Sequence, residues 1–341
     1  MEITFLGGGP IIIRLSKFFL QKNLIKKINI LTSYRQSSEL VSNISFKNQI
    51  EKIQNEYDSS SIKLQIIKNL DDENYFEMVK NSNIVLSLGS AWIFKKRHID
   101  SCEHLFNLHS TDLPRWRGGA PTSWRILSGI NYSSVTLHKI NEAIDDGDIV
   151  YSKKFIFPNE CNTPAQYDKY THEIAFEFLA EFIKNFEKNK DKLEFKPQQK
   201  EFSSYFPRLS SEIHGCINWD WKPIEIVRFV TAFDDPYSGA FTKISGTNQR
   251  VFLKKAKVIE GELNYHPFQS GLVFRKDHIG LYVCANGGAI LISEILDEDK
   301  KIINHLIPEG TRLYSSLDDL EKSKSISIIY NSKGEKLKKY L

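Results

Sequence analysis

An amide, an imidazole and a carboxylate occur in one stretch of this chain, at positions that could bring them together. Asn107 and His109 stand at the end of a mostly apolar run, His104 to Leu108, which is typical of a short buried strand. Residues two apart in a strand project from the same face, so both side chains can point into one cleft. Asp145 opens an acidic turn after the next strand-like run and can return a carboxylate to that cleft.

These three groups suit the transfer of an acyl group to an amine. An imidazole moves protons near neutral pH, and an amide donates to an oxyanion that forms in the transition state. The carboxylate fixes the tautomer of the imidazole or holds its cationic form. No Ser or Cys nucleophile belongs to the set, which favours direct transfer between two bound molecules. From residue types alone, a strand-end cap with a solvated acidic loop is the favoured interpretation.

The order of the surrounding residues favours the chemical interpretation. After Asn107-Leu108-His109 come Thr111, Leu113-Pro114, Arg117-Gly118 and Ala120-Pro121. This order resembles the N-x-H-x-S-L-L-P-x-x-R-G-x-A-P segment of the formyltetrahydrofolate-dependent formyltransferases, and Asp145 matches the first Asp of their D-x-G-D motif. That group contains methionyl-tRNA formyltransferase and the sugar N-formyltransferases. The resemblance implies that Asn107, His109 and Asp145 are catalytic, and that 10-formyltetrahydrofolate is the co-substrate, with no metal.

The segment departs from the family pattern at three positions. Thr111 stands where Ser is usual, Asp112 where Leu is usual, and Gly119 where Ala or Arg is frequent. Thr111 keeps a hydroxyl, whereas Asp112 either alters the rim that faces the folate or is simply exposed.

Two further segments are expected to hold the folate. Gly89–Phe94 directly follows a very apolar strand, and in the family the matching loop holds the pterin ring. The resemblance places a second segment, just before Asp145, against the folate. The expected folate-binding residues are Ala91, Trp92, Ile93, Phe94, Asn141, Glu142, Ala143 and Ile144. The alternative for Trp92 is simple packing in the core.

The first half of the chain alternates strand-like and helical patterns, which predicts a doubly wound, Rossmann-like parallel sheet. In such sheets ligands bind at the carboxyl ends of the strands, where the residues above fall. Gly7-Gly8-Gly9-Pro10 lacks the G-x-G-x-x-G spacing, so a structural turn is expected there and not a dinucleotide site. The strand-like runs are Ile3–Leu6, Ile28–Thr32, Ile62–Ile67, Ile84–Leu88 and Val135–Ile140; the helical runs are Ile11–Leu24, Phe46–Tyr57, Asn74–Lys80, Ala120–Ser128 and Thr163–Phe186.

The chain is expected to divide into residues 1–200, a catalytic domain, and residues 201–313, a small OB-like β-barrel. A charged run, Glu187–Lys200, is typical of a flexible linker between them. Ile217-Asn218-Trp219 and the segment Pro236–Phe241 resemble the C-terminal domain of the family. Residues 314–341 have no counterpart in that resemblance, and a β-hairpin and a tail are both open. The expected barrel strands are Val251–Val258, Gly271–Phe274, Ile279–Val283 and Ala289–Ile295; beyond them Ile326–Tyr330 is strand-like and Asn331–Gly334 a turn.

Composition narrows the compartment and the partners. The formal net charge is +4 without a dense Lys/Arg block, so nucleic-acid binding is not indicated. The four cysteines are widely spaced, which predicts neither a zinc site nor a disulfide framework. No leader-like or membrane-spanning apolar run occurs, and a cytoplasmic protein without membrane contact is expected.

The acceptor amine is the least determined feature. Methionyl-tRNA formyltransferases carry a basic insertion after the second strand, but Leu31–Ser45 contains a single Arg. A nucleotide-linked amino sugar is therefore the expected acceptor, as in the synthesis of surface polysaccharides such as lipopolysaccharide. Arg115 and Arg117, on either side of Trp116, either assist acceptor binding or only pack in the turn. A tRNA enzyme, an enzyme for another small amine, a non-catalytic folate- or sugar-binding module, and a homodimer all stay open.

Overall fold

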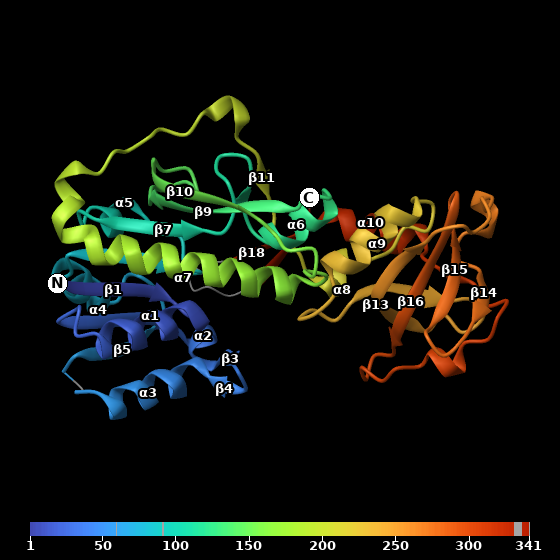
Figure 1. The fold of residues 1–341 in the computed structure, drawn as a ribbon, viewed down its shortest axis with the longest axis horizontal. Helices are drawn as coiled ribbons and strands as arrows, with labels where there is room; N and C mark the ends of the chain where they lie inside the picture. The colour runs from blue at the N-terminus through green and yellow to red at the C-terminus, as the bar shows by residue number, and fades with distance from the viewer. Residues whose placement is uncertain (59, 91, 331–335, 341) are drawn as a thin grey trace.

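The structure, a computed structural model, describes residues 1–58, 60–90, 92–330 and 336–340. Two lobes follow each other along the long axis of the molecule, each built around one sheet (Figure 1). The first lobe is mixed α/β, and the second is mostly antiparallel β. Both expected fold types are confirmed.

The first lobe contains a seven-stranded sheet with the order β10-β9-β7-β6-β1-β2-β5. The five neighbouring strands β7, β6, β1, β2 and β5 run parallel. At the β7 edge, β9 pairs antiparallel with β7, and β10 pairs antiparallel with β9. From β1 the chain moves outward in one direction through β2 and β5, then returns to β6 on the other side. That reversal is the switch point at which doubly wound sheets bind ligands. The strands are β1 Glu2–Gly7, β2 Lys27–Ser33, β5 Ile62–Ile67, β6 Ile84–Leu88, β7 Leu105–His109, β9 Tyr132–Lys139 and β10 Ile149–Ile156.

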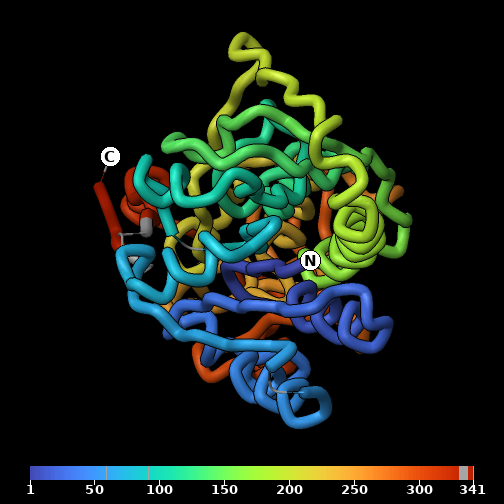
Figure 2. The backbone as a smooth tube through the Cα atoms, turned by 90° about the vertical axis from the view of Figure 1, so that its left-hand side faces the viewer, coloured from blue at the N-terminus to red at the C-terminus, as the bar shows by residue number. Residues whose placement is uncertain are grey.

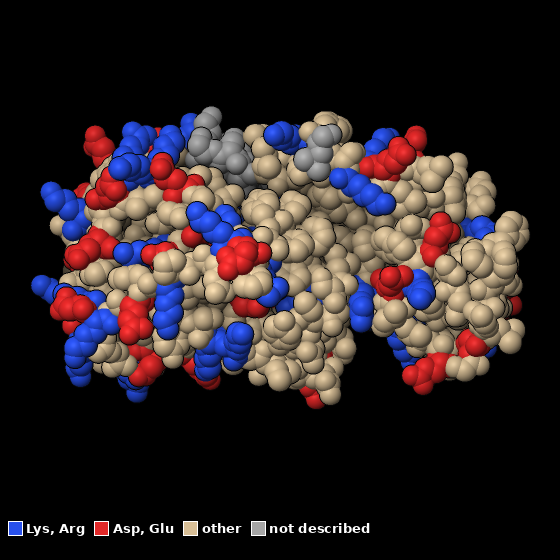
Figure 3. All heavy atoms as spheres, turned by 90° about the horizontal axis from the view of Figure 1, so that it is seen from above, with Lys and Arg blue, Asp and Glu red and all other residues tan. Residues whose placement is uncertain are grey.

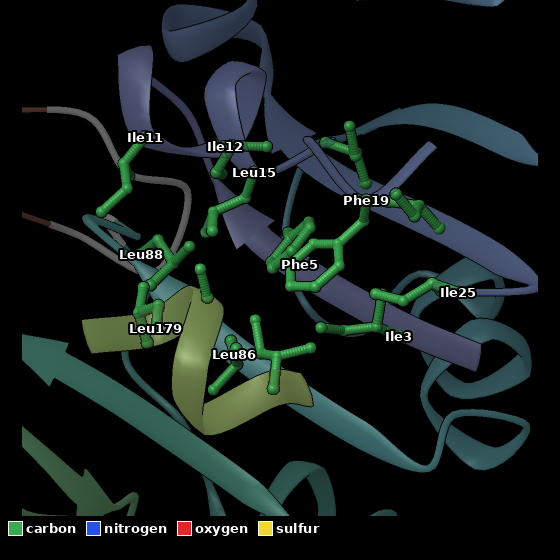
Figure 4. Close-up of a cluster of buried hydrophobic side chains, with 14 of the residues drawn as sticks. Ile3, Phe5, Ile11, Ile12, Leu15, Phe19, Ile25, Leu86, Leu88 and Leu179 are labelled. Atoms are coloured by element: carbon green, nitrogen blue, oxygen red, sulfur yellow. The ribbon is translucent and has the colours of Figure 1, made fainter. Parts of the chain in front are cut away.

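Helices cover both faces of this sheet because successive strand residues point to opposite sides. Phe5 and Leu86 pack with α1 and α7 on one face, where Figure 4 shows Leu15 and Leu179 among them. On the other face, Leu6 and its neighbours pack against α4. The helices of this lobe are α1 Pro10–Gln21, α2 Tyr34–Ser38, α3 Phe46–Glu56, α4 Glu73–Lys80, α5 Lys96–Ile99, α6 Pro121–Leu127 and α7 Pro164–Asn189; a short hairpin joins β3 Leu40–Val41 and β4 Ile44–Ser45.

Local chemistry sets where the long helices begin and end. The Thr163 hydroxyl accepts from the Gln166 amide, and Pro164 occupies the first turn of α7, so the predicted helix start is confirmed. Helix α1 ends at Gln21, before the expected Leu24, because Asn23 turns the chain with a φ of 51°.

The second lobe is a six-stranded antiparallel sheet with the order β14-β15-β16-β13-β12-β17. A bridge between Leu272 and Arg312 joins its two edges, so the sheet curls into a small barrel. Helix α9 covers the barrel core, in which the buried Trp219 donates its indole N–H to Thr242. The elements are α9 Pro223–Ala232, β12 Ala240–Ile244, β13 Arg250–Ile259, β14 Val273–Lys276, β15 Leu281–Ala285, β16 Gly288–Leu296 and β17 Leu313–Tyr314, with 3₁₀ turns at Pro267–Gln269 and Asn304–Leu306.

The segment between the lobes is not a free linker. Lys196 forms a β-bridge with Ile149, and the short strand β11 (Tyr205–Phe206) pairs in parallel with β8 (Arg117–Gly118). The run of lysines is exposed, as its charge predicts, but the backbone returns across the first lobe before the barrel begins. Short turns lie along it: the 3₁₀ turns Lys190–Lys192 and Lys200–Phe202, and helix α8, Ser211–His214.

The C-terminal extension forms an unexpected helix and a β-hairpin, one of the two alternatives that the sequence left open. Helix α10 (Leu317–Ser325) starts at a Ser316 cap and leads into β18 (Ile326–Tyr330), which pairs antiparallel with β19 (Lys336–Tyr340). The turn expected at Asn331–Gly334 lies outside the described residues. The red end of the chain lies at the flank of the molecule (Figure 2). In the described parts of the chain, no helix combines the length and apolar character needed to cross a bilayer.

Candidate active site

A cavity of about 750 Å³ opens at the switch point of the first sheet. That size is usual for a small-molecule site. The ends of β6 and β7, the turn before α1 and the acidic turn all contribute to its lining. Gly8 and Pro10 belong to the lining, so the glycine turn before α1 is part of the site although it lacks a dinucleotide fingerprint.

The three residues expected to act together meet in this cavity. Asn107 and His109 project from the end of β7, as the strand alternation predicts. The Asn107 amide Nδ2 lies 3.4 Å from one Asp145 carboxylate oxygen, and His109 Nδ1 lies 3.5 Å from the other. The acidic turn therefore returns its first carboxylate to the strand end.

Asp145 is a largely buried carboxylate, with 12% of its side chain exposed, and it is held in its charged form. Burial by itself would raise the pKa of the carboxyl. The imidazoles of His109 and His138 and the backbone N–H of Gly118, which donates over 2.9 Å, outweigh burial and hold the pKa well below its ordinary value. The residue also adopts a left-handed backbone with a φ of 50°, an uncommon conformation that collects at functional sites.

The tautomer of His109 follows from its backbone partner. Its Nε2 lies 2.6 Å from the carbonyl oxygen of Trp116, which can only accept, so Nε2 carries the proton. In the neutral ring, Nδ1 is then the nitrogen with a lone pair. In the protonated ring, Nδ1–H faces the Asp145 carboxylate at 3.5 Å, and this is the form that lowers the pKa of Asp145. The Thr111 hydroxyl donates to the same carbonyl over 3.2 Å, which explains why a hydroxyl is retained at this position.

His138 completes the site and was not expected from the sequence. It lies opposite Asn107 in the pairing of β7 with β9, and it is 2% exposed. Its Nδ1 donates to the Lys139 carbonyl over 2.7 Å, so in the neutral ring Nε2 accepts from the Asn107 amide at 3.1 Å. In the protonated ring Nε2–H faces Asp145 at 3.6 Å, and this is the form that lowers the pKa of the carboxyl. The imidazole thus orients the Asn107 amide toward the carboxylate. A polar residue on an inward-facing strand position was the signal for it.

The acidic turn is fastened by residues distant in sequence. Arg117 donates through Nε and Nη2 to the Ile144 carbonyl and pairs with Asp146 over 2.9 Å. Gln198 donates to the carbonyls of Asp145 and Gly147 over 2.9 and 2.8 Å. Arg117 therefore holds the turn, and Asp146 pairs away from His109. Of the two arginines considered for acceptor binding, the other, Arg115, lies over the Phe202 ring.

Two glycines let the return segment approach the site. A side chain on Gly118 would place its Cβ 2.1 Å from the Phe206 carbonyl oxygen, and one on Gly119 would meet Arg208 at 2.2 Å. Gly118 also has a φ of 102°, which disfavours other residues. The family departure at Gly119 thus has a steric cause in this chain.

Both segments expected to hold the folate line the cavity. Trp92 and Phe94 are buried and also pack on the core, whereas Ile93 is 46% exposed. Within the described residues, the buried indole Nε1 of Trp92 has no hydrogen-bond partner. A ligand with an acceptor atom fits such a donor. Residues 141–144 also line the cavity, whereas Ala91 lies outside the described residues.

A doubly wound sheet with a partly buried amide, a buried imidazole and a largely buried carboxylate at its switch point, and without a nucleophile among them, defines a group-transfer enzyme. No cluster of His, Cys, Asp and Glu in the described chain has the arrangement of a metal site. The "Formyl transferase" family model matches residues 36–183, and the "Formyl transferase, C-terminal domain" model matches residues 210–306. The chain belongs to the formyltransferase family, and it is an enzyme of folate-dependent formyl transfer.

The chain is similar to relatives that carry names for different acceptors. A methionyl-tRNA formyltransferase from Agathobacter rectalis is 27% identical over 222 residues, which cover 65% of this chain and 68% of the relative. The fold resembles that of WlaRD, a sugar 3N-formyltransferase crystallised with dTDP and 5-N-formyl-THF (TM-score 0.65, 19% identity, 86% and 97% of the two chains). It also resembles an N-formyltransferase from Helicobacter canadensis in complex with folinic acid and dTDP-3-aminofucose (TM-score 0.63, 19% identity, 86% and 98%).

Substitution of Gly118 tests the close approach of the return segment. Gly118→Ala should lower the free energy of unfolding by about 2 kcal/mol or more and reduce turnover, because the amide that donates to Asp145 must move. Gly246→Ala is the matched control, since Gly246 also has a positive φ but nothing lies within 4 Å of its Cβ position. It should cost only about 1 kcal/mol. Denaturant unfolding and steady-state turnover measure both effects, and equal losses in the two variants would contradict the steric account.

Two substitutions of His138 test whether it orients the Asn107 amide or only stabilises the fold. His138→Ala leaves the Asn107 amide without its acceptor, so kcat should fall about tenfold while the KM values change little. His138→Gln restores an acceptor and should recover part of that loss. A purely structural role would instead lower the melting temperature of both variants and leave kcat per folded molecule unchanged.

Proposed function

We propose that the protein transfers a formyl group from 10-formyltetrahydrofolate to the amine of a nucleotide-linked amino sugar. The observation that carries the proposal is the buried Asp145 carboxylate between His109 and Asn107, at the end of a ligand-sized cavity. This arrangement supplies a proton acceptor, an amide donor and a fixed negative charge at one point. Those are the groups that an amine needs to displace a folate nitrogen from a formyl carbon.

The donor fits the apolar end of the cavity. Trp92 and Phe94 offer an apolar slot for a flat ring, and the unpartnered indole N–H of Trp92 offers a donor to it. Residues 141–144 form the other side of the proposed slot. The bound co-substrate supplies the activated formyl carbon.

His109 has the proton-handling role in the proposed reaction. A neutral amine loses a proton as its nitrogen bonds to the formyl carbon, and Nδ1 of His109 is the available acceptor. The resulting imidazolium faces Asp145, whose charge stabilises it. The same proton then passes to the folate nitrogen as its bond to carbon breaks, so the ring returns to its neutral form.

Asn107 is proposed to stabilise the oxygen of the tetrahedral intermediate. One of its amide hydrogens is taken by His138, whereas the contact with Asp145 is 3.4 Å, longer than an ordinary N–H···O bond. That second hydrogen is available to an oxyanion without loss of a strong bond. The amide is therefore oriented in advance, which is the condition under which such donors accelerate a reaction.

The charge distribution favours a small acceptor over a tRNA. Residues 31–45 form the end of β2, α2 and the β3–β4 hairpin. Arg35 is their single Lys or Arg, and it pairs with Glu39. A protein that holds a tRNA stem needs several cations on its phosphates. On the face drawn in Figure 3, Lys and Arg alternate with Asp and Glu and do not form one positive stripe.

The cavity itself carries limited positive charge. Arg208 is the single Lys or Arg among the described lining residues. The lining also contains His109, His138 and His172. One guanidinium with neighbouring polar groups suits the phosphates of one sugar nucleotide. Methionyl-tRNA is the second candidate acceptor, because the A. rectalis relative carries that name.

The catalytic roles are tested by two substitutions that keep shape. His109→Asn and Asp145→Asn should each lower turnover about 100-fold or more, because each removes a charge or proton site from the transition state. Tetrahydrofolate should still bind, which fluorescence titration can measure. Asp146→Asn, in the same turn but paired with Arg117, should cost less than tenfold in turnover. Equal and mild effects in Asp145→Asn and Asp146→Asn would remove Asp145 from the mechanism.

The acceptor class is tested with purified protein, 10-formyltetrahydrofolate and two kinds of amine. We expect formylation of at least one nucleotide-linked amino sugar and none of methionyl initiator tRNA. The rate should depend weakly on salt, since few phosphates are neutralised; a tRNA enzyme would lose activity steeply. Formylation of methionyl-tRNA at comparable efficiency would overturn the sugar assignment and leave the mechanism intact.

A further inference from the structure

The C-terminal extension contributes to the cavity. Ile328 and Ile329 of β18 line it together with Tyr205 and Arg208 of the return segment. Ile328 is 7% exposed, and Ile329 is 41% exposed. These residues lie beyond the matched C-terminal family segment, which ends at residue 306. A wall of the site is thus built by a part of the chain that the family models leave out.

The extension is attached to the rest of the chain at α10 and at β18. Ile328 forms an antiparallel bridge with Arg208, and the Ile326 carbonyl accepts from His214 Nε2 over 2.8 Å. Lys243 of the barrel pairs with Asp319 over 2.5 Å and ties α10 to the second lobe. Figure 1 shows α10 at the junction of the two lobes. The position of β18 is therefore set by the barrel and by the return segment together.

These attachments place β18 beside the part of the cavity that residues 118–121 line. Arg208 lies against Gly119, and the preceding Phe206 lies against Gly118. β18 thus continues a layer that begins at residues 117–118 and passes through residues 205–208. That layer adjoins residues 118–121, whereas the segments proposed for the folate are residues 92–94 and 141–144.

We propose that Ile328 and Ile329 form the acceptor-side wall of the cavity and determine which amines enter it. The proposal rests on the proposed function, since it assigns the remaining end of the cavity to the nucleotide-linked amino sugar. Two isoleucines, with Ile11 and Pro121 in the same lining, offer apolar surface. The occupant is therefore the less polar part of the acceptor, the face of its base or of a deoxy sugar ring. Arg208, which forms a β-bridge with Ile328, is the single Lys or Arg of the described lining and is assigned to the phosphates.

A bulky substitution tests the wall. Ile329→Trp should raise the KM for the acceptor about tenfold, because the ring would occupy acceptor space, while the KM for 10-formyltetrahydrofolate stays within about twofold. Leu337→Trp is the matched control: Leu337 pairs with Ile329 across the hairpin and is 44% exposed, but it does not line the cavity. It should leave both KM values unchanged. An unchanged acceptor KM in Ile329→Trp, or an equal effect in the control, would overturn the proposal.

A second measurement separates failure of this proposal from failure of the proposed function. In Ile329→Cys, we expect tetrahydrofolate to leave the rate of maleimide labelling at residue 329 unchanged, and the formylated sugar nucleotide to slow it. Labelling is followed by mass spectrometry of the peptide, which separates it from the native cysteines. Protection by tetrahydrofolate would place the hairpin at the donor end and overturn the proposal. If the wild type uses another amine, the sugar assignment fails, and protection by that amine would still support the wall.

Discussion

The buried charge of Asp145 is the constraint on which the active site depends. A carboxylate removed from water costs several kcal/mol unless charges and donors replace its hydration. Here two imidazoles, one backbone amide and one side-chain amide surround it. They come from three strands, β7, β8 and β9, so the sheet order, the turn after β7 and the pairing of β9 must all be correct. The same contacts that make the charge tolerable orient the imidazole and the amide for reaction.

Satisfying this carboxylate also explains features that look unrelated in the chain. Gly118 is needed because its amide must reach Asp145 while its other side touches Phe206. Gly147 is needed because a Cβ there would lie 1.9 Å from the Lys139 carbonyl oxygen, where the turn closes on β9. One arginine is engaged in holding the acidic turn. Arg117 fixes the carbonyl of Ile144 and the carboxylate of Asp146, which leaves little positive charge for a large anionic acceptor.

Helices and strands were predictable from the sequence where one hydrophobic pattern favoured a single kind of element. Ile62–Ile67 and Ile84–Leu88 are strands with the expected bounds, because short β-branched runs bounded by polar residues have few alternatives. Asn107 and His109 were predictable from order and spacing, and the structure brings them to Asp145. Helix α10 was not expected, because LDDLEKSKS has no apolar periodicity and starts from a side-chain cap. His138 and Gln198 escaped because their roles depend on cross-strand register and on single hydrogen bonds. Sequence patterns carry neither.

The position of the return segment has a consequence for synthesis on the ribosome. All seven strands of the first sheet and helix α7 are complete by Asn189, so this lobe can begin to fold while later residues are still being made. Yet the carbonyls of Asp145 and Gly147 gain their Gln198 partner, and β8 gains β11, only after residues 198–206 have emerged. The nascent lobe therefore acquires its hydrophobic core before its reactive geometry. The active-site geometry is therefore complete only after residues 198–206 have packed against the acidic turn and β8.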